Sequence, residues 1–120
     1  MKLPRSRRIT RRVDFKRVRE KGTSHHGKFL VLGVLPDKSL SEPFQMGLIT
    51  TRKLGNAVIR NRFRRRMRGI LHRTGDQIIP GHRLVVIARK AAAEATSMQL
   101  EKEWKWLLHR ASLMQPKKES

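Results

Sequence analysis

Runs of apolar residues mark the expected strands of this chain. Residues 28–35 and 84–88 are almost continuously apolar, as is typical of short strands that are covered on both faces. Residues 44–51 predict another strand after a loop at 36–43, where Pro, Asp and Ser interrupt the apolar pattern. The segment 23–26 allows one more short strand. These elements together predict a small open sheet.

Three other segments carry apolar residues at helical spacing. The first spans roughly 11–20, with Thr10 as its expected N-cap and Gly22 at its end. The second runs over about 56–73, and the third over about 97–112. The order helix, strand, strand, helix, strand, helix, with the optional short strand, indicates the α+β class. Helices are expected to pack mainly on one face of the sheet.

The helix expected over 56–73 has an apolar side and an unusually basic side. At about 100° per residue its apolar residues share an arc of about 120°: Ile59, Phe63, Met67, Ile70 and Leu71. Six arginines lie between positions 60 and 68, and no Asp or Glu at i±4 relieves their repulsion. Several basic residues are expected to point away from the arc together with Asn61: Arg62, Arg65, Arg66 and Arg68. Arg60 lies inside the arc, and its stem is expected to pack near the sheet. An isolated helix gains nothing from this arrangement, which therefore indicates a polyanionic partner.

The net charge is +20, from 29 Lys and Arg against 9 Asp and Glu, and it is unevenly distributed. Residues 1–21 contain ten basic and two acidic residues, whereas residues 52–73 contain nine basic residues and no acidic one. Solvated surfaces usually mix both signs. The asymmetry therefore favours a nucleic-acid partner over an anionic membrane or another polyanion.

Composition also limits the chemistry. The chain has no Cys, which excludes disulfides and thiolate metal sites, and its apolar runs are far too short to span a bilayer. We expect one domain over 1–120 in a cytoplasmic protein, with a flexible basic arm at 1–9 and a flexible tail at 115–120. The acidic residues are scattered, so no carboxylate cluster for Mg²⁺ is expected. His25 and His26 would face opposite sides of an extended segment, which argues against a metal site there.

A second basic group surrounds an aromatic ring in the first expected helix. Phe15 has Arg11, Arg12 and Arg19 beside it. The ring fits either a core position or a platform on which an unpaired RNA base stacks. Hydroxyl and basic residues also follow two strand ends, in positions that favour phosphate: Thr50, Thr51, Arg52 and Lys53 after one strand, and Arg89 and Lys90 after the other.

Several of these residues together resemble the protein subunit of bacterial ribonuclease P. The most specific block consists of Gly47-Leu48, then Arg52-Lys53-Leu54-Gly55-Asn56-Ala57-Val58 and Arg60-Asn61-Arg62. The family's first helix and its exit are resembled by Asp14-Phe15, Val18 and Gly22-Thr23, and its last strand by Ile87-Ala88-Arg89-Lys90. The resemblance covers nearly the whole chain in the expected order.

The resemblance implies a fold and a function. The fold would be a two-layer α/β sandwich related to a ribosomal-protein domain, with a left-handed crossover through the arginine helix. The function would be to join a catalytic RNA that removes the 5′ leader from precursor tRNA. In this family the RNA carries the chemistry and the Mg²⁺ ions, so the protein would have no catalytic residue and no cofactor or small-molecule substrate of its own.

The resemblance also implies two binding surfaces. The catalytic RNA would be bound by the region of the arginine helix: Arg52, Lys53, Asn56, Arg60, Asn61, Arg62, Arg65, Arg66 and Arg68. The leader would be bound in a cleft between the first helix and the sheet: Arg11, Arg12, Phe15, Arg19, Thr50, Arg89 and Lys90. Two departures concern this cleft, because Arg19 stands where the family often has a second aromatic residue and the chain has no Tyr. Leader stacking is therefore expected to be reduced in favour of phosphate contacts.

Three other functions fit parts of the pattern. An RNA-binding or ribosome-associated protein would show the same charge, and only the Gly-Asn and Arg-Asn-Arg residues of the central block argue against it. A helix-turn-helix DNA-binding protein would need a packed helix just before 56–73, where strands are expected instead. A stand-alone nuclease would need clustered carboxylates to hold its metal ions.

Overall fold

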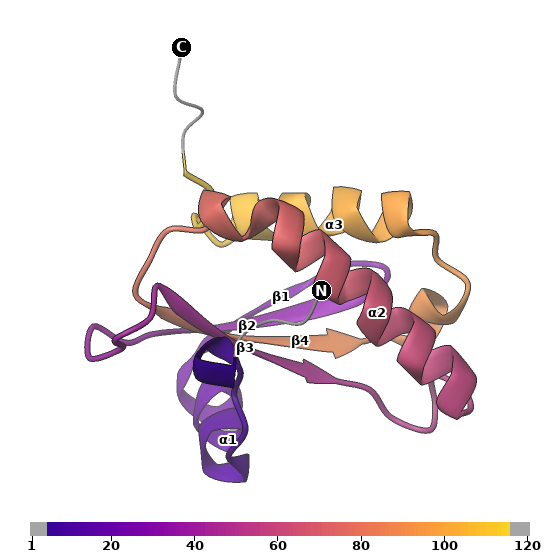
Figure 1. Cartoon of the computed structure of the whole chain (residues 1–120), viewed down its shortest axis with the longest axis horizontal. Coiled ribbons are helices and arrows are strands. Elements are labelled where there is room, and N and C mark those ends of the chain that lie inside the picture. Colours follow the sequence, from indigo (N-terminus) through magenta and orange to yellow (C-terminus); the bar gives the residue numbers. More distant parts are fainter. Residues whose placement is uncertain (1–4, 116–120) are drawn as a thin grey trace.

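The computed structural model describes residues 5–115, which form a four-stranded sheet with helices on both faces (Figure 1). The strands are β1 (Thr23–His26), β2 (Leu30–Pro36), β3 (Phe44–Ile49) and β4 (His82–Ala88). The α-helices are α1 (Arg12–Lys21), α2 (Ala57–Thr74) and α3 (Ser97–Arg110), and short 3₁₀ turns lie at Arg5–Arg7, Gly75–Gln77 and Lys90–Ala93. The optional strand of the sequence pattern is therefore present as β1.

The sheet has the order β1-β2-β4-β3, and of its three strand pairs only β3 and β4 run parallel. Helix α2 connects these two strands as a left-handed crossover (Figure 1). This hand is unusual, because β-α-β crossovers are right-handed in nearly all proteins. The α+β class and the order of elements expected from the sequence are confirmed.

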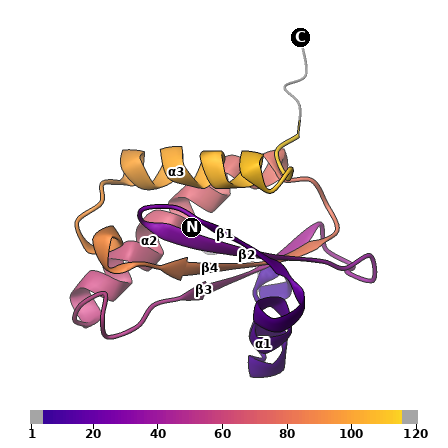
Figure 2. The same cartoon turned by 180° about the vertical axis from the view of Figure 1, so that it is seen from behind.

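Helices α2 and α3 cover one face of the sheet, and α1 lies on the other (Figure 2). On the first face Trp104 is fully buried, and its Nε1 donates to Thr74 Oγ1 at 3.0 Å. Thr74 Oγ1 donates in turn to the Ile70 carbonyl at 2.7 Å, so these bonds join α3 to the last turns of α2. The second face carries a smaller cluster, in which Val18 of α1 packs on Val85 of β4.

The two ends of the described chain make main-chain contacts with the rest of the fold. Ile9 is buried, and its N–H donates to the Met46 carbonyl at 2.9 Å, while Arg8 forms a bridge with Met46. The basic arm is thus docked beside β3 from residue 5 onward. The Gln115 N–H donates to the Gln77 carbonyl at 2.7 Å, so the tail begins as a docked segment as well. Positions 1–4 and 116–120 of the expected arm and tail lie outside the described residues.

One expectation about α1 is wrong. Thr10 does not cap the helix, because Arg11 occupies the N-cap position and its side chain makes no capping hydrogen bond. Helices α2 and α3 share one face, as the sequence predicts for most of the helices, whereas α1 meets the sheet through Val18 on the other face. This division leaves the side chain of Phe15 between α1 and the sheet.

Candidate RNA-binding surfaces

The arginine helix α2 begins with a glycine and a capping asparagine. Asn56 Oδ1 accepts the Ile59 N–H at 3.1 Å, which satisfies one of the free N–H groups of the first turn. Gly55 has a φ of +149°, and a Cβ at this position would lie 2.7 Å from Ile59 Cδ1. Glycine is needed because it tolerates this φ and avoids the clash. The Gly-Asn pair therefore determines where the arginines of α2 begin.

One row of α2 arginines follows i, i+4 spacing: Arg60, Arg64 and Arg68. Arg64 Nη2 donates to Thr50 Oγ1, at the end of β3, at 2.9 Å. Burial lowers the pKa of Arg64, and the charges of Arg68 and Arg60 lower it further. No ion pair among residues 5–115 includes an arginine of this row. The repulsion within the row is therefore not relieved by the described part of the chain.

A second row, Arg62 and Arg66, differs from the expectation. Helical spacing predicts that both point outward, but both are half-buried. Arg62 Nη2 donates to the Ala93 carbonyl at 2.8 Å, and Arg66 Nη1 donates to the Ala95 carbonyl. The cause is the segment after β4, which returns as the turn Lys90–Ala93 and lays its carbonyls against α2. Each guanidinium has five N–H donors, so these bonds leave donors for a ligand.

Of the other residues expected to point outward from α2, Asn61 and Arg65 do so, whereas Arg68 is half-buried as well. Asn61 and Arg65 are exposed on α2, and Arg52 and Lys53 are exposed in the turn that precedes it. Together with the two arginine rows and Asn56 they form a basic surface, which we call the α2 surface. Such a surface suits the phosphates of a folded RNA, to which guanidinium groups bind in a bidentate manner.

Phe15 is the centre of a second surface, on α1. Its ring lies directly over Gly47 of β3, where a Cβ would overlap the ring. The side chain is half-buried and borders a hollow of about 550 Å³, lined by Arg12, Phe15, Lys16, Arg19, Glu20 and Ile49. Phe15 thus combines both interpretations that the sequence leaves open, since it packs on the sheet and also faces a basic hollow. We call this hollow the α1 cleft.

A smaller hollow of about 200 Å³ connects the two surfaces. Phe15 and Gly47 border it together with Arg64 and Arg68 of α2, and Arg8 contributes from the docked arm. The surfaces expected for the catalytic RNA and for the leader therefore meet at Phe15. Sequence reasoning missed Arg64, although i, i+4 spacing was an available signal, and it missed Arg8, for which no signal existed before the arm was seen to dock.

The other residues predicted for the leader extend over the open part of the sheet. Arg11 is exposed at the start of α1, and Thr50 is half-buried at the end of β3. Arg89 and Lys90 are exposed just beyond the end of β4, where Arg89 Nη1 donates to the Gly27 carbonyl at 2.8 Å. Between α1 and the end of β4, three paired positions on the sheet face that carries α1 have half-buried apolar side chains: Val31, Ile87 and Ile49.

Arg83 of β4 holds α1 in position. Its Nε donates to Asp37 Oδ2 at 2.9 Å, and its Nη1 lies 3.0 Å from Asp14 Oδ1 of α1 as an ion pair without an aligned hydrogen bond. Hydrogen bonds from Ser39 and Arg83 lower the pKa of Asp37 to about 2. Because Asp14 precedes Phe15, this ion pair also positions the Phe15 ring over the sheet.

Neither a cluster of metal-binding side chains nor a membrane span is found among the described residues. Within 5–115 no group of three or more His, Asp or Glu is arranged to hold a metal ion. Over the same range, none of the helices combines the length and the apolar character that a membrane span requires. His25 and His26 belong to the antiparallel strand β1 and lie on opposite faces of the sheet.

Comparison with known proteins agrees with this geometry. The model of the family described as Ribonuclease P matches residues 3–112. The chain belongs to the ribonuclease P protein family. It is 40% identical over 112 residues to the ribonuclease P protein component of Mycobacterium sp. (strain KMS), covering 91% of this chain and 92% of that protein. It is 36% identical over 111 residues to the component of Bacillus mycoides (strain KBAB4), covering 92% and 96%.

Solved structures show the same fold. The ribonuclease P protein of Staphylococcus aureus superposes with a TM-score of 0.83 at 30% identity, covering 90% of this chain and 97% of that one. The protein of Thermotoga maritima superposes with a TM-score of 0.77 at 26% identity, covering 86% and 96%. The resemblance on which the sequence expectations rest is confirmed, and family membership assigns this ribonuclease P protein to tRNA processing.

Proposed function

We propose that this chain joins the catalytic RNA of ribonuclease P and supports endonucleolytic removal of the 5′ leader from precursor tRNA, which gives the mature 5′ end. The observation that carries the proposal is the meeting of two basic surfaces at Phe15. One surface comes from α1 and the other from α2, so one small protein can hold a substrate strand next to a second RNA.

The α2 surface is the part that docks on the catalytic RNA in this proposal. It combines a capped helix, an apolar side packed in the core with the sheet, and arginines between 60 and 68 that form no ion pair in the described chain. The residues that bind RNA phosphates would be Arg52, Lys53, Arg60, Arg62, Arg65, Arg66 and Arg68, with Asn56 and Asn61 at the start of the helix.

The α1 cleft receives the leader in this proposal. A leader base stacks on Phe15, and Arg12 and Arg19 beside it bind the adjacent phosphates. Arg11 and Thr50 extend this contact at the ends of α1 and β3, and Arg89 and Lys90 extend it across the open sheet. Mature tRNA has no leader, so this surface distinguishes substrate from product.

The chemistry belongs to the RNA in this proposal. Mg²⁺ ions held by the RNA would supply the activated water for attack at the phosphate, and the protein would bind no cofactor alone. Cations of the protein offset part of the phosphate repulsion that Mg²⁺ otherwise screens, so the protein lowers the Mg²⁺ requirement. The reaction takes place in the cytoplasm, with precursor tRNA as the substrate.

Cleavage assays with RNA alone, protein alone and both together test the proposal over a range of Mg²⁺ concentrations. We expect no product with protein alone, and the largest stimulation of the RNA at low Mg²⁺. Cleavage by highly purified protein without RNA, abolished by mutation of its own side chains, would contradict the proposal. An RNA-binding protein with no part in cleavage would bind the RNA without changing the rate.

A further inference from the structure

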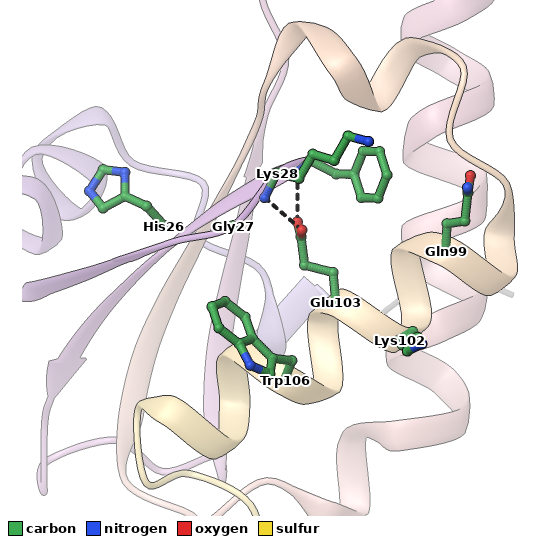
Figure 3. A pocket seen from close by; sticks show the side chains of 8 residues that line it. His26, Gly27, Lys28, Gln99, Lys102, Glu103 and Trp106 are labelled. Atoms are coloured by element: carbon green, nitrogen blue, oxygen red, sulfur yellow. Dashed lines mark hydrogen bonds between the residues drawn. The ribbon is translucent and has the colours of Figure 1, made fainter.

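A third hollow lies at the β1 edge of the sheet, between the β1–β2 turn and α3 (Figure 3). Its volume is about 470 Å³. Trp106 of α3 borders it and is 47% exposed, and the Arg110 guanidinium carbon lies 5.1 Å from the centroid of the indole ring. Phe29 forms another wall, with Lys28 Nζ 5.4 Å from its ring centroid. Two aromatic rings with adjacent cations therefore line one hollow, which we call the Trp106 hollow.

The one carboxylate that lines this hollow is already satisfied by the backbone. Glu103 Oε1 accepts the N–H of Lys28 at 2.7 Å, and Oε2 accepts those of Phe29 and Leu30 at 2.8 and 2.7 Å. Gly27 leaves room for this carboxylate, because a Cβ there would overlap it. The negative charge of Glu103 is thus directed into the protein.

The basic residues at the hollow remain available to a ligand. Within residues 5–115 no ion pair includes Lys28, Lys102 or Arg110. Exposed aromatic surface with adjacent cations is the combination that binds unpaired nucleotides, because bases stack on the rings while cations bind phosphates. The chemistry of the Trp106 hollow therefore suits single-stranded RNA.

One corner of the hollow lies beside the open face of the sheet. His26 borders it, but its side chain points away from Trp106 (Figure 3), toward the sheet face that carries α1. Arg89 reaches the same corner, since its Nη1 donates to the Gly27 carbonyl at 2.8 Å. An RNA strand that crosses the open sheet from the α1 cleft and passes Arg89 thus arrives at the Trp106 hollow.

We propose that Trp106 stacks on an unpaired leader nucleotide that lies farther from the cleavage site than the nucleotides in the α1 cleft. This inference rests on the proposed function, because it takes the leader to occupy the α1 cleft. Lys28, Lys102 and Arg110 bind the phosphates on either side of the stacked base. The leader then contacts two aromatic positions, Phe15 and Trp106, on different edges of the same sheet.

The test uses the holoenzyme reconstituted with its RNA subunit, and precursor tRNAs whose leaders are lengthened one nucleotide at a time. Wild-type affinity should rise in two steps, first as the α1 cleft fills and again as the leader reaches Trp106. Trp106→Ala should remove the second step alone and weaken binding of long leaders about tenfold. Trp106→Phe should retain most of the second step, because it keeps an aromatic ring.

Two controls separate a local effect from a structural one. Met98→Ala changes another exposed residue of α3, 81% exposed and outside this hollow, and should leave both steps intact. Long leaders should also quench the fluorescence of Trp106. The Trp106→Phe protein retains only the buried Trp104, so the difference in fluorescence between the wild type and this variant gives the signal of Trp106.

Equal weakening of short and long leaders by Trp106→Ala, or no weakening, overturns the proposal. A different result would overturn the function proposed for the α1 cleft. In that case affinity shows no first step as the leader is lengthened, and precursor and mature tRNA bind equally well. Quenching of Trp106 by the RNA subunit without any leader also overturns the inference, and assigns the hollow to that RNA.

Discussion

Helices α2 and α3 pack on the same face of the sheet, but the carboxylates of α3 have partners within the protein and most arginines of α2 have no acidic partner there. In α3, Glu101 pairs with Arg73 and Lys105, and Glu103 accepts three backbone N–H groups from the segment entering β2. In α2, the arginines between 60 and 68 have no acidic partner in the described chain. The carboxylates of α3 therefore help to hold this protein together, whereas the arginines of α2 between 60 and 68 are left for a partner.

The largest effect is expected from Glu103→Ala, which removes an internally satisfied charge. Three N–H groups lose a charged acceptor, and one of them belongs to Leu30, which is fully buried. We expect the free energy of unfolding to fall by about 3 kcal/mol, as measured by urea denaturation. Affinity for the catalytic RNA should not change in the folded fraction, because Glu103 lies outside the α2 surface.

A matched control for this change is Glu20→Ala. Glu20 is an exposed carboxylate whose only ion pair in the described chain is with Lys16, at 3.8 Å. Its removal changes the net charge by the same amount, but it should alter stability by less than about 0.5 kcal/mol. Equal losses in the two variants would show that net charge, and not the acceptor role of Glu103, stabilises the fold.

Phe15→Leu is expected to have the next largest effect, and it acts on binding. Leucine keeps part of the packed volume over Gly47 but removes the aromatic face, so the stability loss should stay below about 1.5 kcal/mol. Binding of precursor tRNA by the holoenzyme should weaken by about 1–3 kcal/mol, with no change for mature tRNA. Similar weakening for both tRNAs would mean that Phe15 has a packing role alone.

Within α2, Arg62 and Arg65 are expected to behave differently. Arg65→Ala should reduce the salt dependence of binding to the catalytic RNA by about one unit of log K per log salt, without changing stability. Arg62→Ala should have the same effect on binding and also lower the free energy of unfolding by about 1 kcal/mol, because its bond to the Ala93 carbonyl is lost. Paired salt titrations and thermal melts measure both quantities. Identical stability of the two variants would contradict the stabilising role given to the bond between Arg62 and the Ala93 carbonyl.

Most of the fold could be predicted from the sequence, because the relevant signals are local. The apolar stripe of Phe63 and Met67, the cap at Asn56 and the glycine before it depend on neighbours within two helical turns. Strand positions were similarly visible as apolar runs, although β2 begins at Leu30, two residues later than the pattern suggests. Local rules of spacing and capping decide these features.

Parts of the site could not be predicted, because they depend on distant backbone. Arg62 and Arg66 turn toward carbonyls of the segment after β4, and helical spacing carries no information about where that segment returns. Ile9 docks through a main-chain bond to Met46, which leaves no trace in the side-chain pattern. Glu103 likewise looks like an ordinary surface residue of an amphipathic helix until its N–H partners are known.

The smallest effect concerns another internally satisfied charge, that of Asp37 beside Arg83. Folding lowers the pKa of Asp37 from 3.8 to about 2, so its contribution to stability is present above about pH 4 and is lost as the pH falls toward about 2. Solvent screening in this surface loop limits the contribution to less than about 1 kcal/mol. Asp37→Asn should therefore be slightly less stable than the wild type near neutral pH and equally stable near pH 2, as measured by urea denaturation at each pH. A difference that stays constant across this range would assign the effect to packing and not to charge. Asp37 lies outside the α2 surface, so this variant should leave binding of the catalytic RNA unchanged and thereby separate the two kinds of charge.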